Sequence, residues 1–131
     1  MKTILVDAGK TFVVNGHLFT PIYELLEQYN NKKIILSNAN DEEILNGGLI
    51  DLPYELFTLK HDPDKNNPMY FDTLFKKFNL KPEDCVYFDH VEEAVKSADS
   101  VGVKSYYYDS EKKDLAALKF FLDKNLLNIT S

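Results

Sequence analysis

Two aspartates, each at the end of an apolar run, are the residues of this chain best placed for chemistry. Asp7 closes a run that begins at Ile4, and Asp89 closes a second run that begins at Val86. Open α/β sheets bind their ligands at the carboxyl ends of the strands. Two carboxylates at adjacent strand ends would offer the hard oxygen ligands that Mg²⁺ prefers. The pair therefore predicts a magnesium site.

Other polar residues follow the predicted strands and could hold an anion. Ser37 and Asn38 come directly after an apolar segment, and Lys65 lies in the loop before the helix start at Pro68. A hydroxyl, backbone N–H groups and a cation are the parts that a phosphoryl-transfer site needs beside its metal. Lys60 also lies near a strand end and competes with Lys65 for this role. The chain has no arginine, so it lacks a bidentate group for phosphate and depends on lysine and metal.

The elements that position these residues alternate between strands and helices. Short segments rich in β-branched and aromatic residues predict strands at 3–7, 33–37, 54–59, 85–89 and 104–108. Stretches with apolar residues at helical spacing lie between and after them. This alternation predicts repeated βα units around a mostly parallel sheet, in a three-layer α/β/α sandwich. The length of 131 residues fits a single domain spanning 1–131.

Local start signals place the helices more closely. Thr20 can cap a helix whose first residue is Pro21, and Asn67 with Pro68 repeats this pattern. A shorter helix is expected after position 40 or 41, ending before the glycines at 47 and 48. A fourth helix is expected from about Val91 to a stop at Gly102, and the last one uses the leucines between 115 and 126.

Composition excludes several classes of partner. The net charge is −6, from 15 Lys and Arg against 21 Asp and Glu. Nucleic acids and anionic membrane surfaces both favour basic proteins, so neither is expected to be the main partner. The single cysteine, Cys85, begins a predicted buried strand and is expected to be a core residue. A charge interrupts the first apolar run too early for a signal peptide, so we expect a cytoplasmic protein.

The order of these motifs resembles the haloacid dehalogenase-like (HAD) superfamily, whose members are mostly Mg²⁺-dependent phosphatases. The family's first motif is an apolar strand followed by Asp-x-Asp-x-Thr, and the segment Asp-Ala-Gly-Lys-Thr at 7–11 is similar to it. The second motif matches Ser37, the third matches Lys65 before Pro68, and the fourth matches Asp89 followed by His90. The resemblance covers nearly the whole chain.

The resemblance implies a fold and a set of roles. The fold would be a parallel five-stranded, Rossmann-like HAD core without a cap domain, because neither interval that carries caps has spare length. The reaction would proceed through an aspartyl-phosphate, with Mg²⁺ as cofactor and a phosphorylated small molecule or macromolecule as partner. The roles implied are catalytic for Asp7, Lys65 and Ser37, substrate-binding for Thr11, Ser37, Asn38 and Lys65, and metal-binding for Asp7, the Gly9 carbonyl and Asp89.

One departure from the family pattern concerns proton transfer. The family's general acid/base stands two residues after the nucleophile, and this chain has Gly9 there. Loss of a general acid typically removes about 10²- to 10⁴-fold of rate. The alternative to a weak phosphohydrolase is thus an inactive HAD-like protein that binds metal and a phosphorylated ligand or protein partner. A histidine elsewhere, at 17, 61 or 90, could replace the missing acid. The oligomeric state is left open.

Overall fold

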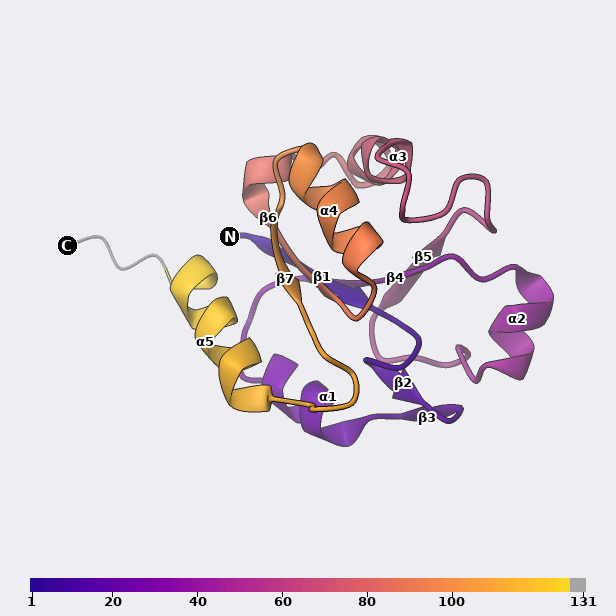
Figure 1. Cartoon of the computed structure of the whole chain (residues 1–131), viewed down its shortest axis with the longest axis horizontal. Coiled ribbons are helices and arrows are strands. Elements are labelled where there is room, and N and C mark those ends of the chain that lie inside the picture. Colours follow the sequence, from indigo (N-terminus) through magenta and orange to yellow (C-terminus); the bar gives the residue numbers. More distant parts are fainter. Residues whose placement is uncertain (128–131) are drawn as a thin grey trace.

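A parallel five-stranded sheet forms the centre of the computed structural model, which describes residues 1–127 (Figure 1). The strand order is β5-β4-β1-β6-β7, so β1 is central, with β4 on one side and β6 on the other. The chain reverses its direction of winding at β1, and this is where open α/β sheets place their sites. The strands are β1 (Thr3–Asp7), β4 (Lys33–Ser37), β5 (Glu55–Thr58), β6 (Cys85–Asp89) and β7 (Lys104–Tyr107).

Two pairs of helices cover the two faces of the sheet (Figure 1). Side chains alternate along β1, so Ile4 and Val6 face one core and Leu5 faces the other. Apolar residues of α1 and α5 fill the first core, and those of α3 and α4 fill the second. The predicted three-layer sandwich is therefore confirmed. The covering helices are α1 (Thr20–Leu26), α3 (Met69–Phe78), α4 (Glu92–Ser100) and α5 (Leu115–Leu126).

A small hairpin beyond the carboxyl end of β1 was not expected from the sequence. Strands β2 (Val13–Val14) and β3 (His17–Leu18) are joined by Asn15 and Gly16, whose φ values of 53° and 77° are both left-handed. Gly16 packs against the turn after α2 (Asp41–Asn46), because a Cβ built on Gly48 would lie 2.3 Å from the Gly16 carbonyl oxygen. The hairpin and this turn thus stand side by side.

Several predicted boundaries were wrong by a residue or two. Helix α1 already includes Thr20 and is capped by the backbone of Phe19, with no side-chain cap. Pro68 is the N-cap of α3 rather than its first residue, and the Asn67 side chain accepts a hydrogen bond from the N–H of Met69. The strands expected at 54–59 and 104–108 are shorter in the structure. A 3₁₀ turn, η1 (Pro82–Asp84), precedes β6.

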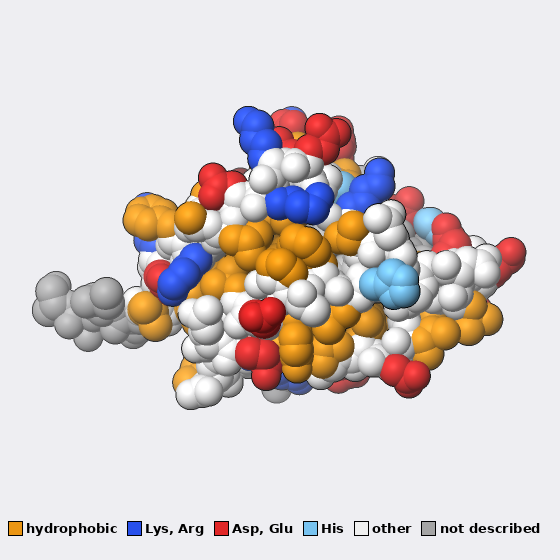
Figure 2. All heavy atoms as spheres, turned by 90° about the horizontal axis from the view of Figure 1, so that it is seen from below, with side chains coloured by type: hydrophobic (Ala, Val, Ile, Leu, Met, Phe, Trp, Pro, Cys, Tyr) orange, Lys and Arg blue, Asp and Glu red, His pale blue; other side chains and the backbone are white. Residues whose placement is uncertain are grey.

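The intervals that could carry a cap domain are filled by the core itself. The hairpin and α1 lie between β1 and β4, and α2, β5 and their connecting loops lie between β4 and α3. No cap domain is present within residues 1–127. In the same range, no helix is long and apolar enough to cross a membrane. Figure 2 shows the α1 and α5 side, where apolar patches alternate with separate charged side chains.

Candidate active site

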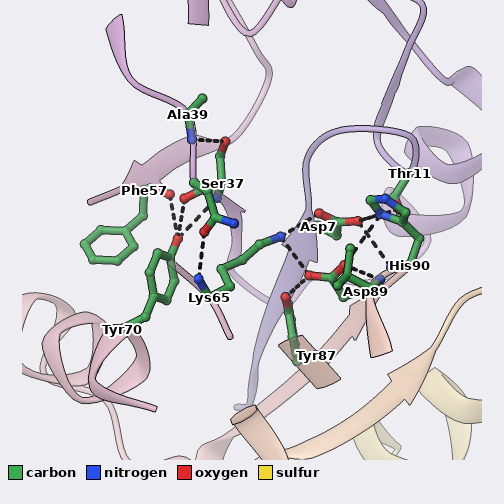
Figure 3. A network of polar contacts seen from close by, with 12 residues as sticks. Asp7, Thr11, Ser37, Ala39, Phe57, Lys65, Tyr70, Tyr87, Asp89 and His90 are labelled. Atoms are coloured by element: carbon green, nitrogen blue, oxygen red, sulfur yellow. Dashed lines mark hydrogen bonds and ion pairs between the residues drawn. The ribbon is translucent and has the colours of Figure 1, made fainter. Parts of the chain in front are cut away.

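A buried ammonium group joins the two strand-end aspartates. The Nζ atom of Lys65 lies 2.7 Å from Asp7 Oδ1 and 2.7 Å from Asp89 Oδ2 (Figure 3). Asp7 ends β1, Asp89 ends the neighbouring strand β6, and Lys65 reaches them from the loop before α3. The side chains are only 3%, 0% and 7% exposed, in that order. Three residues far apart in the sequence thus form one almost fully buried cluster of charged side chains.

The second oxygen of Asp7 has partners of its own. The Thr11 hydroxyl donates to Asp7 Oδ2 at 2.7 Å, from the tight turn that follows β1. His90 Nδ1 lies 2.5 Å from the same oxygen, and the His90 N–H donates to it at 3.3 Å. These contacts fix the rotamer of Asp7 from both sides, which is a requirement for a group that must be aimed at a substrate.

Asp89 is held by its own strand and by the loop that follows. The hydroxyl of Tyr87, two residues earlier on the same face of β6, donates to Asp89 Oδ2. The N–H of Val91 donates to Asp89 Oδ1 at 2.8 Å. Both carboxylates of the cluster therefore keep one oxygen on Lys65 and one on the side of the loop at 90–91.

Burial and neighbouring charges together shift the pKa values of all three buried groups. Burial alone would raise the pKa of Asp7, but the Lys65 ammonium and the His90 imidazole outweigh it and hold this pKa below its usual range. Burial and the neighbouring Asp7 charge raise the pKa of Asp89. Burial would lower the pKa of Lys65, yet the two carboxylates raise it. Asp7 is thus the more acidic of the two carboxylates.

The residues after β4 are ordered by contacts beneath them. Ser37 Oγ accepts a hydrogen bond from the N–H of Ala39 at 2.9 Å, and Asn38 Oδ1 accepts one from the N–H of Lys65 at 2.7 Å. The buried hydroxyl of Tyr70, from α3, lies 2.9 Å from the Ser37 carbonyl oxygen and 3.0 Å from that of Phe57. Helix α3 is therefore tied to the ends of β4 and β5, directly beside Lys65.

A pocket of about 270 Å³ opens above the cluster. Asp7 and Lys65 lie at its base, and His61 and Glu43 lie toward its rim with exposed side chains. Asp89 and Thr11 do not line it, because both are fully buried beneath. The predicted site residues that share the lining are Asp7, Gly9, Ser37, Asn38 and Lys65.

The structure separates the residues that sequence analysis left as alternatives. Lys60 is exposed and pairs with Asp41 at 3.1 Å, away from the carboxylate cluster. Among the histidines, His17 lies on β3 outside the pocket lining, whereas His61 and His90 both belong to it. Lys65 is thus the lysine that contacts both aspartates, and two of the three histidines, His61 and His90, line the pocket.

Sequence analysis missed a polar group at the rim. His61 contacts Glu43 through Nε2 at 2.5 Å and Asp64 through Nδ1 at 2.8 Å, which joins α2 to the loop before α3. The hydrogen bonds to these two carboxylates raise the pKa of His61. Lys60 and His61 both have left-handed φ, 54° and 66°. Nothing in the local sequence indicates this arrangement, because Glu43 is far from the loop along the chain.

The donor atoms of the site suit a divalent cation. Asp7, Asp89 and His90 each place one ligand atom within 4.8 Å of the others. Two carboxylates from neighbouring strands supply oxygen ligands, and Asp7 lines the pocket. The residues present therefore fit the metal that the resemblance implies.

Comparison with known proteins shows the fold. No protein-family model matches the chain, and no curated protein matches it in sequence. Solved structures do match. HAD family enzyme BT-2542 of Bacteroides thetaiotaomicron superposes with a TM-score of 0.70 at 13% identity, over 90% of this chain and 98% of that one. That enzyme has been crystallised with magnesium and inorganic phosphate.

Two further structures extend the comparison. An HAD-like family hydrolase from Porphyromonas gingivalis gives a TM-score of 0.69 at 12% identity, over 93% of this chain and 98% of that one. The D,D-heptose 1,7-bisphosphate phosphatase of Burkholderia thailandensis gives 0.57 at 12% identity, over 89% and 85%. The predicted fold, a Rossmann-like HAD core without a cap, is confirmed.

Proposed function

We propose that this chain, which has the fold of the HAD enzymes, is a divalent-metal-dependent phosphohydrolase that works through an aspartyl-phosphate on Asp7. The observation that carries the proposal is the contact of one buried ammonium group, Lys65, with the carboxylates of both Asp7 and Asp89. This contact keeps a carboxylate ionised at the base of a pocket, beside a cation that can neutralise a phosphoryl group.

Each site residue has a defined task in this reaction. A carboxylate oxygen of Asp7 attacks phosphorus, and the bond to the leaving-group oxygen breaks, which gives an acyl phosphate. Water then attacks phosphorus, releases inorganic phosphate and restores the carboxylate. Lys65, the Ser37 hydroxyl and the Asn38 amide hold the phosphoryl oxygens. A divalent ion bound by Asp7, Asp89 and the Gly9 carbonyl, with Mg²⁺ the ion implied by the family, supplies further positive charge.

Gly9 limits the range of substrates. No acid stands at this position to protonate the leaving group, so the leaving group must take its proton from solvent. Aryl and acyl phosphates, whose leaving groups are stable anions, are therefore favoured over alkyl phosphates. The same residue supports a second candidate function, an inactive HAD-like protein that binds metal and a phosphorylated ligand or protein partner.

An activated substrate separates the two functions. The purified protein is assayed on an aryl phosphate with Mg²⁺ and, separately, with Mn²⁺, next to an Asp7→Asn variant. The phosphohydrolase predicts turnover by the wild type and a loss of at least about 10²-fold in the variant. Equal rates in the two proteins would contradict it and favour the binding protein.

A further inference from the structure

The candidate metal site has a nitrogen donor beside its oxygen donors. Asp7 and Asp89 contribute carboxylate oxygens, and His90 contributes an imidazole nitrogen within the same 4.8 Å. Mg²⁺ is a hard cation that binds oxygen ligands and keeps several waters. Imidazole instead suits transition-metal ions such as Zn²⁺, Fe²⁺ and Ni²⁺. Mn²⁺ shares the oxygen ligands of Mg²⁺ but, as a transition-metal ion, binds an imidazole nitrogen more readily. The identity of residue 90 therefore bears directly on which ion the site selects.

Lys65 does not take the two carboxylate oxygens that lie nearest His90; these accept hydrogen bonds from the Thr11 hydroxyl and from backbone N–H groups. The Lys65 Nζ atom takes Asp7 Oδ1 and Asp89 Oδ2. The other two oxygens, Asp7 Oδ2 and Asp89 Oδ1, lie 2.5 and 3.5 Å from His90 Nδ1 (Figure 3). The ammonium group and a metal would thus use opposite oxygens of the same two carboxylates, and neither has to displace the other.

The spacing of the three atoms fits one coordination sphere. Two ligands about 2.1 Å from a common ion and at right angles to each other lie about 3 Å apart. The separations from His90 Nδ1 to the two oxygens, 2.5 and 3.5 Å, fall on either side of this value. His90 and Asp7 also line the pocket, so further coordination positions face the space where a phosphate would bind.

The charge of the ligands, like their donor type, disfavours Mg²⁺ at this site. With His90 as a neutral donor the site has two anionic ligands, and the Lys65 ammonium group offsets part of their charge. Mg²⁺ gains most of its binding energy from ligand charge, so it loses more than an ion that also forms a strong bond to nitrogen.

We propose that the site binds a divalent first-row transition-metal ion such as Mn²⁺ in preference to Mg²⁺, with His90 Nδ1 as a direct ligand. The inference rests on the proposed function, because it assigns the ion to the carboxylates of the same site. It assigns to this chain a metal selectivity different from that expected of an all-oxygen site.

Mn²⁺ provides both an affinity and a spectroscopic signature. Metal-free protein is titrated calorimetrically with Mn²⁺ and with Mg²⁺, and the Mn²⁺ form is examined by pulsed electron paramagnetic resonance for ¹⁴N modulation from a bound imidazole. The wild type is expected to bind Mn²⁺ roughly tenfold or more tightly than Mg²⁺ and to show the nitrogen signal. His90→Asp is expected to abolish the ¹⁴N signal and to reduce the ratio of Mn²⁺ affinity to Mg²⁺ affinity. His17→Asn and His61→Asn are expected to keep both the signal and the ratio.

The outcomes distinguish this inference from the proposed function. A wild-type protein without the nitrogen signal, or one that binds Mg²⁺ as tightly as Mn²⁺, overturns the inference; turnover with Mg²⁺ in that protein would leave the phosphohydrolase standing. A nitrogen signal that only His90→Asp removes supports the inference even if an aryl phosphate is not hydrolysed with either ion. A protein that binds neither ion contradicts both proposals.

Discussion

Gly9 is the residue at which the chain departs from the first motif of the family that it resembles. A Cβ at this position would meet no heavy atom within 4 Å, and the backbone of Gly9 is not left-handed. Gly9 also shares the pocket lining with Asp7. A larger side chain can therefore enter the pocket here without strain.

The first prediction follows from that space. Gly9→Asp is expected to raise kcat/KM for an alkyl phosphate by about 10²- to 10⁴-fold, because it adds a proton donor beside the leaving group. Steady-state kinetics with Gly9→Asn as control separate proton donation from shape, since Asn is similar in size but cannot serve as the acid. An unchanged rate in Gly9→Asp would mean that the site lacks more than its acid.

The second prediction concerns the ionic cluster. Lys65→Met leaves two adjacent buried carboxylates with only the partly exposed His90 imidazole beside them and is expected to cost about 3–5 kcal/mol of unfolding free energy. The matched control is Lys60→Met, which removes an exposed pair with Asp41 and is expected to cost about 0–1 kcal/mol. Urea unfolding at neutral pH measures both. Similar losses in the two variants would contradict the buried ion-pair cluster.

Strand-end position was enough to select the two aspartates of this cluster, but not their partners. Asp7 and Asp89 are hydrophilic residues at the ends of apolar segments, so they stand out in the sequence, whereas Lys65 was indicated only by the helix start at Pro68 and competed with Lys60. Tyr87 and Tyr70 do not, since a tyrosine in an apolar segment is normally a core residue. The two-residue spacing of Tyr87 and Asp89 on one strand was a usable signal, because it places both side chains on the same face.

At the scale of elements, the strands were predictable because each is a short apolar run, whereas the hairpin was not recognised. Its strands have two residues each, too short for a periodicity. The Asn-Gly pair at 15–16 was the available signal, because this pair favours a two-residue turn with two left-handed residues. The start of helix α1 was predicted one residue too late, because its N-cap is Phe19, whose side chain makes no capping hydrogen bond.

The third prediction tests the packing of the hairpin. Gly48 has a left-handed φ of 72°, and an added Cβ would lie 2.3 Å from the Gly16 carbonyl oxygen. Gly48→Ala must therefore separate two backbones and is expected to lower the unfolding free energy by about 1–3 kcal/mol. Gly9→Ala, which meets open space, is the control in the same denaturation experiment. Equal stability of the two variants would show that the hairpin is not packed against this turn.

The fourth prediction concerns the contact between α2 and the loop before α3. The hydrogen bonds to Glu43 and Asp64 raise the pKa of His61. Such a group stabilises the folded state below its unfolded pKa, and the contribution is lost as the pH rises through the higher folded value. The contact between α2 and the loop before α3 is therefore expected to weaken as the pH rises.

Nuclear magnetic resonance titration of the His61 ring measures this pKa. Glu43→Gln is expected to lower it by removing the negative charge, while the Gln side chain can still accept the hydrogen bond from the Asn40 N–H that caps α2. Glu42→Gln, a neighbouring charge with no contact to the ring among the described residues, is the control. A pKa that is the same in all three proteins would contradict the contact.

At the scale of the molecule, the alternation of short apolar runs with helical periods was sufficient to predict the three-layer α/β/α arrangement. A parallel sheet buries both faces, so its strands are apolar throughout, and this makes them visible in the sequence. The order β5-β4-β1-β6-β7 was implied only by the family resemblance. The close approach of Lys65 to β1 depends on the loop after β5, whose path no local pattern encodes.

The fifth prediction applies to the whole fold. An ion that binds only the folded chain stabilises it by about 2.7 kcal/mol at one hundred times its dissociation constant. Addition of Mn²⁺ is therefore expected to shift the urea midpoint upward, and excess EDTA to reverse the shift. Asp89→Asn should remove the metal-induced increment whatever its effect on the metal-free protein. A midpoint that is insensitive to metal in the wild type would contradict metal binding at the cluster.

The small volume of the pocket limits how much of a ligand it can enclose. At about 270 Å³ it lies below the roughly 300–1,000 Å³ of typical small-molecule sites. In the proposed reaction, a phosphoryl group with a few attached atoms would fill that space, and the remainder of a larger ester would extend past the exposed side chains of Glu43 and His61. Most of the binding energy would then come from the portion that every ester shares with its product, and inorganic phosphate is expected to be a strong competitive inhibitor.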